Sequence, residues 1–201
     1  MRIRALMLAF LCCFGTSAFS QIAPDSFHFR SVTYAGSGCP AGSVAYSISP
    51  DRLSFSFLFD SLIAEAGPSS SLSNARKNCA INIDLEYPDG WIFTIVSVDY
   101  RGFANLQDAV NGTIKSTYYF QGSSSSPTAQ STLRGPKMLD FRYRDTFTTQ
   151  GWSTCRAKRA LNINSQTRVD NSAAPGNYGV LTVDSVDGQV WHSFNILWQR
   201  C

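Results

Sequence analysis

Carboxylates and histidines are the first groups to consider for catalysis, and this chain has few of them. Asp84 and Glu86 stand two residues apart in an alternating run, which predicts that both point the same way from one strand, roughly 6–7 Å apart at the backbone. Such a pair could supply the two carboxyl groups that glycoside hydrolysis needs. The opposite face of the run is apolar, however, and this pattern is typical of a half-buried strand with its charges in water. We therefore expect a solvated pair.

The sequence contains only two histidines, His28 and His192. His192 shares a predicted strand face with Phe194, Ile196 and Trp198, which favours an imidazole packed at the edge of the core. The chain has no GxSxG elbow that would mark a serine nucleophile. A hydrolase with Asp84, Glu86, Asp99 or His192 in its site is accordingly the weakest of three functional hypotheses, and we assign no catalytic residue.

Tyrosines, an arginine and an acid gather in two runs, 98–103 (VDYRGF) and 115–120 (KSTYYF). Aromatic rings beside polar side chains suit sugars, because the C–H face of a sugar stacks on a ring. The predicted ligand-binding set comprises five residues: Asp99, Tyr100, Arg101, Tyr118 and Tyr119. The competing interpretation is structural, since aromatic residues favour strands and Asp99 with Arg101 could simply hold a turn.

Four cysteines lie beyond the N-terminal segment: Cys39, Cys79, Cys155 and Cys201. They allow three disulfide pairings. We favour Cys39–Cys79 with Cys155–Cys201, because these sequential pairs keep each half of the chain self-contained. The alternative use of cysteine is metal binding, but no CxxC pair or cysteine–histidine cluster occurs. We therefore expect disulfides, an oxidising compartment, and neither a metal nor a cofactor.

The N-terminus predicts a secretory signal peptide over residues 1–20. Arg2 and Arg4 precede a short apolar stretch, and Ala18 and Ser20 are the small residues expected before cleavage at Gln21. Cleavage would leave 15 of the 17 basic residues against 14 acids. A nearly neutral chain gives no electrostatic reason to expect a nucleic-acid partner, and the apolar stretch is too short to span a membrane. In a secreted chain, the sequon Asn111-Gly112-Thr113 makes Asn111 a glycosylation candidate.

Alternation with a period of two dominates the remaining sequence, clearest at 53–59, 81–87 and 141–144. Further strands are expected at 43–48, 91–100, 114–121, 161–169, 179–183 and 190–198, and one short helical turn at 103–110. Pro88-Asp89-Gly90 and Asp187-Gly188 are turn signals. Many short strands without long helices predict an all-β fold, a jelly-roll-like antiparallel β-sandwich stapled by disulfides, in a single domain over 21–201. A closed β-barrel is the alternative.

Six short motifs occur in a recognisable order: 36–40 (GSGCP), 76–79 (RKNC), 99–103 (DYRGF), 115–120 (KSTYYF), 161–164 (LNIN) and 198–201 (WQRC). With them the chain resembles the secreted family called domain of unknown function 4360, over about residues 32–201. The resemblance implies a small secreted β-rich protein, commonly of filamentous fungi, and it supplies no catalytic residues. For a fungal source it suggests action at a host or cell-wall surface.

The leading hypothesis from the sequence is therefore a non-enzymatic extracellular protein, effector-like or associated with the cell wall. The second is a carbohydrate-binding module that uses Tyr100, Arg101, Tyr118 and Tyr119. The expected partner is either a cell-wall polysaccharide or a host extracellular protein.

Overall fold

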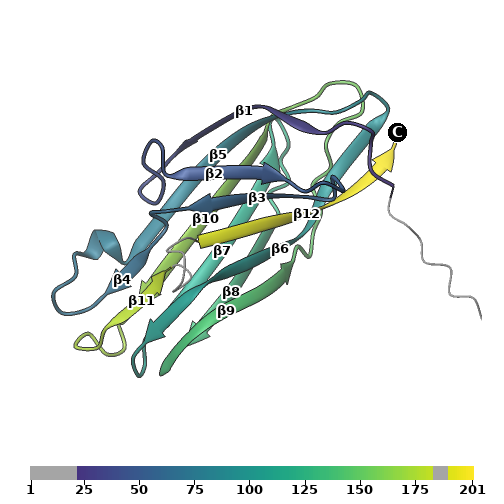
Figure 1. Ribbon diagram of the computed structural model, residues 1–201. Coiled ribbons are helices and arrows are strands. Elements are labelled where there is room, and N and C mark those ends of the chain that lie inside the picture. Colours follow the sequence, from purple (N-terminus) through teal and green to yellow (C-terminus); the bar gives the residue numbers. More distant parts are fainter. Residues whose placement is uncertain (1–21, 183–189) are drawn as a thin grey trace, which may run out of the picture.

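A computed structural model describes residues 22–182 and 190–201 as two antiparallel sheets packed face to face (Figure 1). The first sheet has five strands in the order β1 (His28–Ala35), β5 (Arg76–Glu86), β10 (Leu161–Asp170), β7 (Asn111–Phe120) and β8 (Thr128–Arg134). This arrangement confirms the antiparallel sandwich and not the closed barrel. The predicted signal peptide and the Asp187-Gly188 turn lie outside the described residues.

The second sheet has seven strands. Its main path runs β2 (Val44–Ile48), β3 (Ser54–Phe59), β12 (Val190–Arg200), β6 (Trp91–Leu106), β11 (Gly179–Thr182) and β4 (Ala64–Ala66). The seventh strand, β9 (Lys137–Thr146), pairs with the other edge of β6. One turn of 3-10 helix, η1 (Leu72–Asn74), precedes β5.

The long strand β6 corrects one expectation from the sequence. The predicted helical turn at 103–110 is wrong, because residues 103–106 continue β6 and pair with both β9 and β11. Ala104 and Leu106 are buried while Phe103 and Asn105 are half-buried, so the period of two persists to the end of the strand. Only residues 107–110 turn, closed by a hydrogen bond from the Val110 nitrogen to the Gln107 oxygen.

Aromatic side chains between the sheets form much of the core. Phe55, Phe57 and Phe59 alternate inward from β3 and are fully buried, and Phe55 stacks on Phe194 of β12 with ring centroids 5.4 Å apart. Burial of large aromatic side chains is the strongest apolar contribution available to a domain of this size. The same alternation turns the polar residues of each strand outward, and it therefore determines which residues reach solvent.

Two disulfides join distant segments, with the sequential pairing favoured from the sequence. Cys39 bonds to Cys79 of β5, and Cys155 bonds to the terminal residue Cys201. Cys201 also donates a backbone hydrogen bond to the oxygen of Gly90, in the predicted Pro88-Asp89-Gly90 turn. Gly90 has a φ of 80°, which favours glycine at this position. The C-terminus is thus fixed to the start of β6.

Candidate functional site

Two tyrosines of the sequence-predicted ligand set, Tyr100 and Tyr118, lie in the core and have no exposed surface. The Tyr118 hydroxyl accepts a hydrogen bond from the Gly151 nitrogen at 3.1 Å and donates to the Ile95 oxygen at 3.0 Å. The Tyr100 ring stands edge-on to the imidazole of His192, with centroids 4.8 Å apart. These two residues hold the sheets together, and neither reaches a ligand on the surface.

Asp99 and Arg101 follow the outward alternation of β6 and lie on the outer face of the seven-stranded sheet. The Asp99 carboxylate accepts two hydrogen bonds from Arg144, at 2.8 and 2.9 Å, and one from Asn195 at 2.8 Å. Burial acts to raise the pKa of Asp99, but these hydrogen bonds outweigh it and hold the pKa below its usual value. Asp99 is therefore an ionised group that is already occupied by partners from its own sheet.

Tyr119 is the only one of the five residues on the outer face of the five-stranded sheet, where its side chain is 40% exposed. The predicted set is thus divided between the core and two opposite surfaces. The structure does not bring Asp99, Tyr100, Arg101, Tyr118 and Tyr119 together into one shelf.

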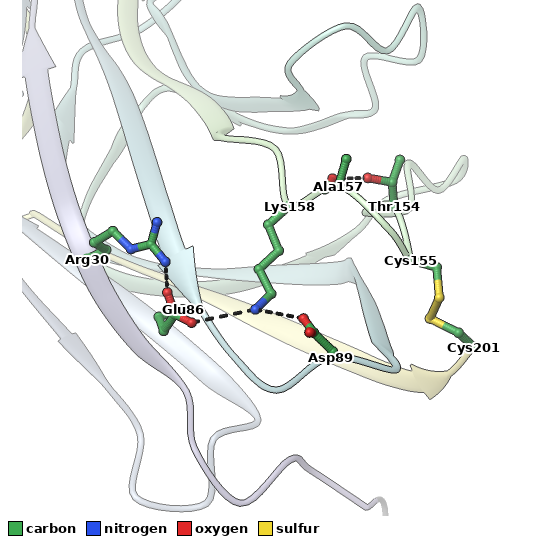
Figure 2. A network of polar contacts seen from close by, with 8 residues as sticks. All are labelled: Arg30, Glu86, Asp89, Thr154, Cys155, Ala157, Lys158 and Cys201. Carbon is green, nitrogen blue, oxygen red and sulfur yellow. Dashed lines mark hydrogen bonds and ion pairs between the residues drawn. A yellow bond between two sulfur atoms is a disulfide. The ribbon is translucent and has the colours of Figure 1, made fainter.

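Two of the candidate acids, Asp84 and Glu86, are engaged in ion pairs at one end of the sandwich. Glu86 pairs with Arg30 and lies 3.5 Å from the ammonium of Lys158, which also lies 3.1 Å from Asp89 (Figure 2). Asp84 lies 3.5 Å from Arg30. This network ties β1, the end of β5 and the segment next to the Cys155–Cys201 disulfide to one another, so its chemistry is structural.

His192 is sealed between the sheets and has no exposed surface. Its Nδ1 lies 3.1 Å from the hydroxyl of Ser165 on β10, and its Nε2 has no hydrogen-bond partner among the residues that the structure describes. Burial lowers the pKa of His192 to about 3. The imidazole is therefore neutral at physiological pH and inaccessible to a substrate.

An open hollow of about 300 Å³ marks the outer face of the five-stranded sheet, beside Tyr119. A transverse row of side chains crosses it, with Thr33 opposite Asn82, Asn82 opposite Asn162, and Asn162 opposite Tyr119. The row spans three strand spacings, about 14 Å. Asn164, two residues along β10, also lines the hollow. We call Thr33, Asn82, Asn162, Asn164 and Tyr119 the amide row.

Local sequence explains why space is left here. Ala35 and Ala80 face each other across β1 and β5 in the next transverse row, and both line the hollow. Their methyl side chains leave the sheet surface low next to the longer amide side chains. The depression is therefore a direct result of two small residues at adjacent outward positions.

The two central amides are arranged for further hydrogen bonding. The Asn82 Nδ2 donates to the Asn162 Oδ1 at 2.8 Å. This bond leaves the Asn82 oxygen as an acceptor and the Asn162 amino group as a donor, and neither has a further side-chain partner within the described ranges. The row therefore offers paired donors and acceptors next to an exposed aromatic ring, without a formal charge.

The asparagines of this site are not among the residues predicted from the sequence. Asn82 and Asn162 were visible as outward members of alternating runs, but nothing in the sequence placed β5 next to β10 or set their register. In the part of the chain that the structure describes, no group of three or more histidine, cysteine, aspartate or glutamate side chains could hold a metal ion. No helix in that part is long and apolar enough to cross a membrane.

Comparison with known proteins gives a family match over most of the chain. The family model described as "Domain of unknown function (DUF4360)" matches residues 25–201. A protein of Arthroderma benhamiae named "Uncharacterized secreted protein" is 42% identical over 180 residues, which cover 89% of this chain and 73% of the relative. This relative and the two disulfides agree that the protein is secreted and extracellular.

Two solved structures show a distant likeness. TmCBM61 in complex with beta-1,4-galactotriose aligns with a TM-score of 0.23 and 8% identity, covering 86% of this chain and 90% of that chain. A family 11 carbohydrate-binding module from Clostridium thermocellum, in complex with a mixed-linked tetrasaccharide, aligns with a TM-score of 0.24 and 8% identity, covering 88% and 92%. At these TM-scores the likeness contributes nothing to the assignment of a ligand.

Proposed function

The chain belongs to the family described as Domain of unknown function (DUF4360), and we propose that it is a non-enzymatic, cell-wall-associated protein that binds carbohydrate. The proposal rests on one observation: an uncharged row of amides ends on an exposed tyrosine across an open hollow. The ligand would lie across the strands, on the outer face of the five-stranded sheet.

Sugars match this lining in two ways. Each sugar hydroxyl can donate and accept a hydrogen bond, and the amides of Asn82 and Asn162 leave one acceptor and one donor side by side. The apolar face of a sugar ring can pack on Tyr119, which lies directly opposite Asn162. A few convergent polar groups beside an aromatic ring are typical of small-molecule sites. Since the row carries no charge, we expect a neutral polysaccharide.

The positions of the titratable residues support a non-enzymatic role. Glu86 and Asp99 are held by basic side chains on different faces of the molecule, and His192 is enclosed in the core. A hydrolase would need such groups to converge on one substrate bond. We also propose one mature domain over 21–201 following a cleaved leader over 1–20, and the continuous core shared by both sheets supports the single domain.

Binding to insoluble neutral polysaccharides tests the proposal. We expect the wild-type protein to co-sediment with at least one member of a panel of chitin, β-glucan and mannan. Tyr119→Ala and Asn162→Ala should each reduce the bound fraction, because each removes one side of the row. Tyr46→Ala is the matched control, since Tyr46 is similarly exposed (45%) but lies on β2 of the other sheet.

Two results would reject the proposal. The first is no binding to any member of the panel by correctly folded, disulfide-bonded protein. The second is binding that both Tyr119→Ala and Asn162→Ala leave unchanged, because the ligand would then contact another surface.

A further inference from the structure

A second hollow, of about 540 Å³, lies on the same outer face at the other end of β7. Asn111 and Thr113, the first and third residues of the sequon, both line it, together with Arg134, Arg168 and Asp170. The carbohydrate-binding proposal does not use this hollow. A sequon whose acceptor side chain opens into unfilled space is a combination that the sequence alone could not reveal.

The strand alternation directs the Asn111 side chain outward, so the folded protein has room for a glycan on it. Asn111 and Thr113 are half-buried and point outward from β7, whereas Gly112 between them is buried. A Cβ atom at Gly112 would lie 3.2 Å from Leu106 and 3.4 Å from Leu181, so this position faces the core. No residue in the described ranges hydrogen bonds to the Asn111 side-chain amide.

The residues on either side of Asn111 offer both kinds of hydrogen-bonding group. Asn111 lies opposite Arg134 on β8 and opposite Asp170 on β10. Arg134 is exposed and makes no ion pair within the described part of the chain. Asp170 is held in place by Arg168 at 3.0 Å and by the backbone nitrogen of Ser172 at 3.0 Å. A guanidinium donor and a carboxylate acceptor thus flank the amide at neighbouring-strand spacing.

We propose that Asn111 carries an N-linked glycan and that the hollow seats its first sugar between Arg134 and Asp170. In the modification, a lipid-pyrophosphate oligosaccharide donates its glycan. The Asn111 Nδ2 bonds to the anomeric carbon and loses one proton, while the bond from that carbon to the pyrophosphate oxygen breaks and the lipid pyrophosphate leaves. Because Asn111 is paired on both sides in the sheet, transfer precedes folding.

This modification is independent of the proposed ligand site on the same face. Eight residues along β7 separate Asn111 from Tyr119, about 27 Å at the rise of a strand. The glycan covers the end of the sheet near Asp170 and leaves the amide row open. An absent glycan would therefore not contradict carbohydrate binding at Tyr119. A failure to bind carbohydrate would likewise not contradict glycosylation of Asn111.

The first test is the intact mass of protein secreted by a eukaryotic host. We expect peptide:N-glycosidase to remove one oligosaccharide from wild type and to convert Asn111 to aspartate. Asn111→Gln and Thr113→Ala should lack the glycan, whereas the conservative variant Thr113→Ser should keep it, because serine also completes a sequon. Secreted wild-type protein with an unmodified Asn111 would overturn the proposal.

The second test asks whether the hollow holds the first sugar of the glycan between Arg134 and Asp170. An endoglycosidase that cuts between the first two sugars should act several-fold faster on native Arg134→Ala and Asp170→Asn than on native wild type, with equal rates after denaturation. Lys115→Ala is the control, since Lys115 is on the same face of β7 but does not line the hollow. If the endoglycosidase cleaves native wild type and all three native variants at equal rates, the proposed contacts of the first sugar with Arg134 and Asp170 are wrong.

Discussion

Replacing His192 by glutamine should remove a pH dependence from the stability of this protein. His192 has no exposed surface, and its imidazole packs between the rings of Phe59 and Tyr100, with centroids 5.2 and 4.8 Å away. The folded protein keeps this histidine neutral, because burial lowers its pKa from 6.5 to about 3. The unfolded chain takes up a proton below pH 6.5 and the folded protein does not. Stability is therefore fully present above that pH and is lost as the pH falls towards 3.

The expected size follows from the two pKa values. Their difference corresponds to about 5 kcal/mol of unfolding free energy once the pH has fallen well below 3, at about 1.4 kcal/mol for each unit of pKa difference. Between pH 7.5 and pH 5, both accessible without strong acid, the same linkage gives a loss of about 2 kcal/mol. Asp and Glu residues contribute little to this interval because most stay ionised at pH 5.

Urea unfolding with the disulfides intact, at pH 7.5 and pH 5, measures this difference. Wild type should lose about 2 kcal/mol more than His192→Gln between the two pH values. His28→Gln is the control, since His28 is exposed on β1, and it should retain the wild-type difference. A full wild-type pH dependence in His192→Gln would refute this linkage between burial and stability.

Three further predictions concern stability. Tyr118→Phe leaves the Gly151 nitrogen and the Ile95 oxygen without their hydroxyl partner, so the free energy of unfolding from urea melts should fall by about 1–3 kcal/mol; an unchanged value would refute the buried contacts. The pair Cys155→Ser with Cys201→Ser opens a crosslink over a sequence separation of 46 residues, and in the chain-entropy model it should destabilise the protein by about 4 kcal/mol. Lys158→Met removes ion pairs with Glu86 and Asp89 that are partly exposed to solvent, so it should lower the free energy of unfolding by less than about 1 kcal/mol in the same assay. A loss as large as that of the cysteine pair would contradict this view of the network.

Period-two runs predicted the strands well where one face is strongly apolar. The runs at 53–59, 81–87 and 161–169 correspond to β3, β5 and β10, because their alternating large apolar residues all enter the core. Three strands at sheet edges, β1, β4 and β8, were not predicted from the sequence. In β8 only Ala129 and Leu133 are buried, so apolar periodicity is weak there, and the pairing with β7 determines the strand.

The candidate site was less accessible from the sequence than the fold. Adjacent residues in a strand face opposite sides, so alternation alone separates Tyr118 from Tyr119 once both are placed in one strand. The amide row is different, because Thr33, Asn82, Asn162 and Tyr119 meet only through the register of four strands. Register between segments so distant in sequence depends on packing of the whole core, which local patterns do not encode.

Chemical-shift mapping with a soluble neutral oligosaccharide tests the central claim most directly. In two-dimensional amide spectra of the intact secreted protein, a saccharide from a polysaccharide that the protein binds should perturb signals of Thr33, Asn82, Asn162, Asn164 and Tyr119, side-chain amides included. Signals of Asp99 and Arg101 on the opposite sheet should stay in place. Perturbations confined to the outer face of the seven-stranded sheet would contradict the account.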